Sequence, residues 1–187
     1  MNITFTRTGE RTYATQATRG DGVTLQVPSP DRPALLPHDL AHYVVERELG
    51  LRRGFWGRIA DGAVLPGITV VSGRQPPHAA ERSRVILREA GPQGTHAEVL
   101  VGVLLANLHD NGAAAAAVAR VAAAWAPARP EREPLTDLEI RRAHDALRDA
   151  LERWQALAVG QSLSVRWPSA VRGARTKRPA RRRRARF

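Results

Sequence analysis

The first 27 residues alternate between apolar or small side chains and polar neighbours. Three short segments, residues 3–5, 13–17 and 23–27, share this period of two, which is typical of β-strands that bury one face. Gly9 with Glu10 and the triplet 20–22 supply turn residues between the segments. The pattern therefore predicts a three-stranded antiparallel meander at the N-terminus.

From residue 38 the apolar positions follow a helical period instead. We expect helices over the following segments: 38–49, 79–90, 99–108, 113–126 and a last helix with an apolar stripe from Ile140 to Ala158. Capping boxes are predicted where Thr95 precedes Glu98 and where Thr136 precedes Glu139.

Two further apolar patterns add to the sheet. The run 68–71 is a candidate strand, and the alternation over 163–167 predicts that the chain returns to the N-terminal sheet. The predicted fold is therefore α+β: a small antiparallel sheet, made of the N-terminal three-stranded meander plus a C-terminal strand, packed on four or five helices. We expect residues 1–167 to form one domain and residues 168–187 to form a disordered basic tail.

Composition narrows the class of protein. The chain has 187 residues, of which 43% are apolar and 25% are charged, as expected for one globular domain. No apolar run is long enough to cross a membrane, and the N-terminus lacks the features of a signal peptide, so we expect a cytoplasmic protein. Because the chain has no cysteine, a metal ion would have to be held by His, Asp and Glu.

The net charge of +11 comes mainly from the tail. Residues 168–187 hold nine of the 29 basic residues and no acidic one, so residues 1–167 carry a net charge near +2. An arginine-rich end of this kind either is a solvated, disordered end or attaches to nucleic acid or another anionic surface. The arginines expected to make such contacts are Arg178, Arg181, Arg182, Arg183 and Arg184.

The predicted helix 38–49 contains the candidate chemistry. His38, His42 and Glu46 stand four residues apart, at about 0°, 40° and 80° around a helix, with Asp39 at about 100°. They share one face, at the border of the apolar arc. Two imidazoles one turn apart can bind one divalent metal ion, zinc in particular, as in His-Glu-x-x-His proteases, where the acidic residue after the first His acts as general base.

Helix geometry limits the number of ligands from this helix. The Cα atoms of His38 and Glu46 are about 12 Å apart on a straight helix, so we do not expect one ion to bind both of them together with His42. We expect His38 and His42 to be ligands, a third ligand to come from elsewhere, and Glu46 to accept a hydrogen bond from an imidazole. The sequence does not choose the third ligand, although the chain has other histidines: His78, His96, His109 and His144.

The segment from His38 to His42, His-Asp-Leu-Ala-His, resembles the HDxxH zinc signature of a ubiquinone-biosynthesis family. The resemblance implies zinc at both histidines. That family is all-helical, and its motif adds a Glu about a dozen residues later; here the position is Gly54, so Glu46 or Glu48 would have to substitute. The stretch 36–57, ending in Gly-Phe-Trp-Gly, resembles uncharacterised proteins of GC-rich bacteria and implies no activity.

Several functions therefore remain open. In the first, the protein is a zinc-dependent metalloprotein, hydrolytic if it is an enzyme, with ligands His38 and His42 and with Asp39 or Glu46 orienting ligand or water. In the alternative, it is a non-enzymatic binding protein that uses its arginine tail for nucleic acid, and the helix 38–49 is a core helix whose histidines bond loop carbonyls. A metal-free polar site or a partner surface on this helix is the remaining possibility.

Overall fold

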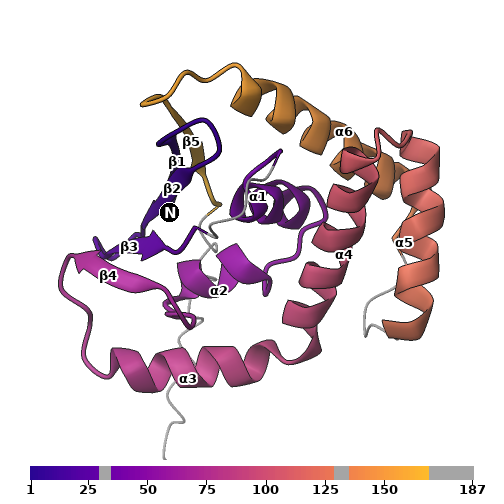
Figure 1. The fold of residues 1–187 in the computed structure, drawn as a ribbon. Helices are drawn as coiled ribbons and strands as arrows, with labels where there is room; N and C mark the ends of the chain where they lie inside the picture. The colour runs from indigo at the N-terminus through magenta and orange to yellow at the C-terminus, as the bar shows by residue number, and fades with distance from the viewer. Residues whose placement is uncertain (30–34, 129–134, 169–187) are drawn as a thin grey trace, which may run out of the picture.

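The computed structural model describes residues 1–29, 35–128 and 135–168. Figure 1 shows a small sheet with helices gathered on one side. In chain order the elements are β1 (Asn2–Arg7), β2 (Tyr13–Thr18), β3 (Thr24–Val27), α1 (His38–Glu48), α2 (Phe55–Asp61), β4 (Thr69–Ser72), α3 (Ala79–Ala90), α4 (Pro92–His109), α5 (Ala114–Ala128), α6 (Asp137–Gln155) and β5 (Ser162–Arg166). The predicted α+β class is confirmed.

The sheet has the order β4-β3-β2-β1-β5 with antiparallel neighbours throughout. The predicted meander is present, and so is the predicted return of the chain, because β5 pairs with β1 and places Val165 opposite Ile3. The candidate strand over 68–71 is also confirmed, as β4 on the far edge. Ile3, Phe5 and Leu25 point inward and are fully buried.

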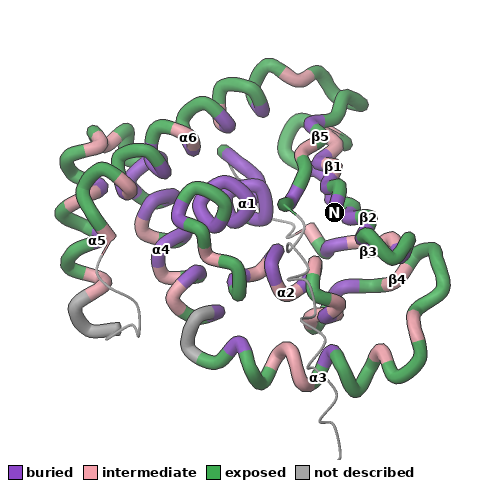
Figure 2. The backbone as a smooth tube through the Cα atoms, turned by 180° about the vertical axis from the view of Figure 1, so that it is seen from behind, coloured by how far each residue is buried: buried purple, intermediate pink, exposed green. Residues whose placement is uncertain are grey.

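Helix α1 forms the centre of the core. It packs against α2, α4 and α6, and its residues 39–46 are all buried, as the purple colour of α1 in Figure 2 shows. The indole of Trp56 meets Phe5 edge-on, with ring centroids 6.1 Å apart, and its Nε1 donates a 2.8 Å hydrogen bond to the carbonyl of Asp39. This bond ties α2 to the first turn of α1.

Two helices differ from the prediction. The described residues contain six helices rather than four or five, because the segment 55–61 forms α2 within a region expected to be loop. Helix α4 begins at Pro92 rather than after a cap at Thr95, since proline suits the first helical turn and the preceding Gly91 adopts a left-handed φ of 48°. The predicted Thr95–Glu98 capping box is therefore wrong, and Glu98 lies inside the helix.

The predicted cap of α6 is confirmed. The hydroxyl of Thr136 accepts a bond from the Glu139 amide, and the carboxylate of Glu139 accepts one from the Thr136 amide. Across the described residues, no helix combines the length and apolar character needed to cross a membrane.

Candidate metal centre

His38, His42 and Glu98 form a cluster where α1 crosses α4. The two imidazoles project from successive turns of α1 with ring centroids 4.8 Å apart. Glu98 comes from α4, 56 residues further along the chain, and its Oε2 lies 3.2 Å from His42 Nε2. One nitrogen or oxygen from each of the three side chains lies within 4.8 Å of the other two. These side chains could therefore hold a metal ion.

The three side chains differ in exposure. His42 is 1% exposed, whereas His38 is exposed and the side chain of Glu98 is 52% exposed. Donor atoms around tetrahedral zinc lie about 3.3 Å apart, so an ion would draw the three groups closer together. His38 and Glu98 have the freedom to make this adjustment, because solvent surrounds much of each side chain.

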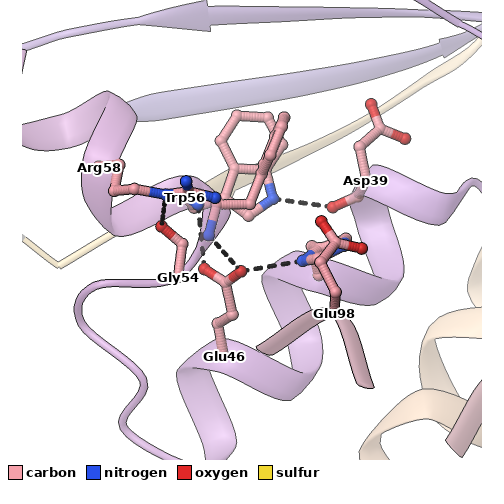
Figure 3. Close-up of polar contacts among 8 residues, drawn as sticks. Asp39, Glu46, Gly54, Trp56, Arg58 and Glu98 are labelled. Atoms are coloured by element: carbon pink, nitrogen blue, oxygen red, sulfur yellow. Dashed lines mark hydrogen bonds and ion pairs between the residues drawn. The ribbon is translucent and has the colours of Figure 1, made fainter. Parts of the chain in front are cut away.

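Glu46 holds the ring of His42 from the opposite side. Its Oε1 lies 2.9 Å from His42 Nδ1 and accepts a 2.5 Å bond from the Phe55 amide, while its Oε2 accepts a 3.0 Å bond from the Trp56 amide. Figure 3 shows the carboxylate of Glu46 beside Gly54 and Trp56 at the start of α2. Because Gly54 has no side chain to cap α2, the buried carboxylate of Glu46 performs that role for its first amides. The expected contact between Glu46 and a histidine ring is thus present.

The Gly-Phe-Trp-Gly sequence has a packing explanation. A Cβ on Gly54 would overlap the carboxylate of Glu46, and a Cβ on Gly57 would overlap the carbonyl of Arg52. Phe55 lies beside His42, with ring centroids 5.4 Å apart, and Trp56 is fully buried. Gly54 therefore lets α2 begin close enough to α1 for Glu46 to reach its amides, and Gly57 lets α2 pack against the loop that precedes it.

The carboxylates set the protonation of His42. Burial alone would lower the pKa of His42, but hydrogen bonds and charge interactions with Glu46 and Glu98 raise this pKa to about 9. At neutral pH, without a metal ion, Nδ1 donates to Glu46 and Nε2 donates to Glu98. A metal ion at Nε2 would have to displace that proton.

The other two groups of the cluster are in forms that suit a ligand. Burial and the neighbouring positive charge of His42 lower the pKa of His38, against an opposing effect of Glu98. The hydrogen bond from His42 lowers the pKa of Glu98, in spite of partial burial. At neutral pH, His38 is therefore a neutral imidazole with a free lone pair, and Glu98 is a carboxylate.

Asp39 lies outside this cluster. It is 6% exposed, and neither carboxylate oxygen has a hydrogen-bond partner of good geometry among the described residues. Burial raises the pKa of Asp39, while the Thr15 and Tyr13 hydroxyls and the amides of the first turn of α1 act in the opposite direction. Thr15 and Tyr13 belong to β2, so the Asp39 carboxylate lies beside that strand, and Figure 3 shows it pointing away from Glu98.

A pocket of about 180 Å³ opens beside the cluster. Its polar lining consists of Tyr13, His38, Asp39, His42 and Glu98. Its apolar lining consists of Val27, Pro28, Phe55, Pro66 and Ile68. Asp39 therefore lines the same pocket as the three candidate metal ligands.

The remaining candidates from the sequence lie elsewhere. Of the other histidines, none joins the cluster; His144 is buried, with Nε2 3.1 Å from the carbonyl of Gly112, as expected of a satisfied core histidine. Glu48 is exposed and does not supply the third group. The five tail arginines, Arg178 and Arg181 to Arg184, lie outside the described residues.

Sequence reasoning missed Glu98 because it was assigned to a helix cap. One signal could have identified it: Glu98 is the sole acidic residue between Glu89 and Asp110, next to a long apolar segment.

Comparison with protein-family models, with curated proteins and with solved structures found no match to this chain.

Replacing Glu46 by Gln should destabilise the protein. The Gln amide group would place a donor against one of the two α2 amides, so a buried donor loses its acceptor, at about 1–3 kcal/mol in the free energy of unfolding. Urea unfolding measures this change. The matched control is Glu48→Gln, an exposed glutamate on the same helix, expected to stay within about 0.5 kcal/mol of wild type. Equal stability of all three proteins would contradict the assigned role of Glu46.

The pKa of His42 predicts how stability depends on pH in chelator-treated protein. The folded state holds the His42 proton up to about pH 9, whereas the unfolded chain holds it only up to about pH 6.5. The protonated His42 therefore stabilises the folded state fully below pH 6.5. This contribution to the free energy of unfolding, up to about 3 kcal/mol, is lost as the pH rises towards 9. Urea unfolding at successive pH values should show the fall in wild type and a flatter profile in His42→Gln. Parallel profiles would refute the raised pKa.

Proposed function

We propose that this protein binds a divalent metal ion, zinc, through His38, His42 and Glu98. The observation that carries the proposal is the convergence of two imidazoles and one carboxylate from α1 and α4 within 4.8 Å. Two histidines and one glutamate are a known ligand set of catalytic zinc, which keeps a fourth position for water or substrate.

The surroundings of His42 support this proposal. Metal-binding histidines usually donate their second ring N–H to a carboxylate, which fixes the tautomer and the ring orientation. Glu46 accepts that bond at Nδ1, and two backbone amides hold Glu46 in turn. Nε2 of His42 therefore already faces Glu98 and the exposed side of the cluster, so binding of an ion there would need no rearrangement of the core.

The open side of the cluster favours a reaction over a purely structural role. The pocket of about 180 Å³ lies against all three candidate ligands, so a water molecule on zinc and a small substrate would meet there. Zinc lowers the pKa of its bound water to about 7. With zinc held by His38, His42 and Glu98, the metal ion would supply a nucleophilic hydroxide at neutral pH for the hydrolysis of an ester or amide in the pocket.

Two acidic residues of α1, Glu46 and Asp39, take separate parts in this proposal. Glu46 is fully buried and makes three hydrogen bonds, so it is a positioning residue for His42 and does not touch water or substrate. Asp39 lines the pocket and is assigned to orient the bound ligand.

Metal analysis tests the ligand set. We expect about one zinc ion per chain in purified wild-type protein and in the control His109→Ala, whose histidine ends α4 outside the cluster. His42→Ala and Glu98→Gln should lose the ion, because two remaining ligands hold zinc weakly. Glu98→Gln changes a half-exposed side chain, so it should stay folded, which circular dichroism verifies.

Two outcomes would overturn parts of this proposal. Equal trace metal in wild type and Glu98→Gln would remove the site. Stoichiometric iron instead of zinc would keep the ligand set, which also suits non-haem iron, and would overturn the zinc assignment.

Hydrolysis is tested with p-nitrophenyl acetate. Zinc-loaded wild-type protein should release p-nitrophenol at least tenfold faster than chelator-treated protein or Glu98→Gln, and the rate should rise through about pH 7 as the metal-bound water loses its proton. His109→Ala should match wild type. A rate that is independent of zinc would contradict a hydrolytic role and leave metal binding in place.

A further inference from the structure

Asp39 is a buried carboxyl group without a cationic partner. It is 6% exposed, and the ion pairs seen among the described residues do not include it. Both of its oxygens lack a hydrogen-bond partner of good geometry there. Buried carboxylates are normally paired or fully hydrogen-bonded, because leaving water is costly for a charged group. An unpaired one therefore indicates a missing partner.

Thr15 adds to this polar spot on the sheet side of α1. Its hydroxyl is fully buried and, like the oxygens of Asp39, makes no hydrogen bond of good geometry. Tyr13, two residues away on β2, lines the pocket together with Asp39. The spot thus holds one carboxylate and two hydroxyl groups, and the described part of the chain supplies no cation to the carboxylate.

The pocket joins this spot to the proposed metal site. Asp39 and Tyr13 share its lining with His38, His42 and Glu98, while Val27, Phe55 and Ile68 form part of the apolar wall. Its volume of about 180 Å³ corresponds to roughly six water molecules in the liquid. A ligand that fits inside is therefore small, with two polar ends and a short apolar middle.

We propose that this pocket takes a small primary amine whose ammonium group pairs with Asp39 and whose carbonyl or carboxylate oxygen coordinates the metal ion. The pairing of the ammonium group with Asp39, which we call the amine half, depends on Asp39 alone. The coordination of the ligand oxygen by the metal ion, the metal half, rests on the function proposed above. Esters or amides of small amino acids are the substrate class that has both groups. A negatively charged substrate is disfavoured, because Asp39 and Glu98 would both repel it.

The amine half is tested on chelator-treated protein with two probes of the same shape. n-Butylamine should bind at least tenfold more tightly than n-butanol, as measured by calorimetry or by chemical shifts, because only the amine carries a charge for Asp39. Asp39→Asn should remove this preference. The matched control Asp149→Asn, which removes an exposed aspartate on α6, should retain it. Equal binding of amine and alcohol by wild type, which needs no variant, would overturn the amine half.

The metal half is tested on zinc-loaded protein with glycine hydroxamate and acetohydroxamate, which differ in the amino group. Glycine hydroxamate should bind at least tenfold more tightly to wild type, and the two should bind equally to Asp39→Asn. Equal binding to wild type, with zinc bound, would overturn the inference and leave the metal function standing. Absence of zinc, with n-butylamine still preferred, would overturn the metal function and the metal half and leave the amine site.

Discussion

The buried carboxylate of Glu46 is the interaction on which the rest of the site depends. A carboxylate taken fully out of water is tolerated only where hydrogen bonds replace those of water, and Glu46 has three: one to the His42 ring and two to the first amides of α2. These hydrogen bonds determine where α2 begins and which nitrogen of His42 faces outward. They also explain the glycine at position 54, because a side chain there would overlap the Glu46 carboxylate. One charged group thus couples the local fold to the candidate chemistry.

This arrangement gives the cluster one rigid member and two adjustable ones. His42 is enclosed and held at both nitrogens, whereas His38 and Glu98 are exposed. In such a site the buried ring would keep its geometry, and the two exposed groups would complete the coordination of an ion. The 3.2 Å contact between His42 Nε2 and Glu98 Oε2 links α1 to α4.

The sequence predicted those features that depend on residues close together along the chain. The alternation at the N-terminus was sufficient for the meander, and the four-residue spacing of His38, His42 and Glu46 was sufficient to place them on one helix face. Helix α2 was missed because its cap comes from Glu46 on another helix, so no capping residue precedes it. Glu98 was misassigned because Gly91 and Pro92 start α4 one turn before Thr95, and its pairing with His42 spans 56 residues.

Helix α1 contains two buried carboxyl groups with opposite environments, and the contrast separates their roles. The carboxylate of Glu46 makes three hydrogen bonds within the protein, to the His42 ring and to two amides of α2. Its charge therefore has a structural role. Asp39, on the first turn, is equally enclosed but has no well-formed bond among the described residues. Burial without partners lowers stability, and such groups persist in proteins mainly where function requires them. The unpartnered oxygens of Asp39, on the pocket that the candidate metal ligands share, are the reason for proposing that Asp39 binds the ligand.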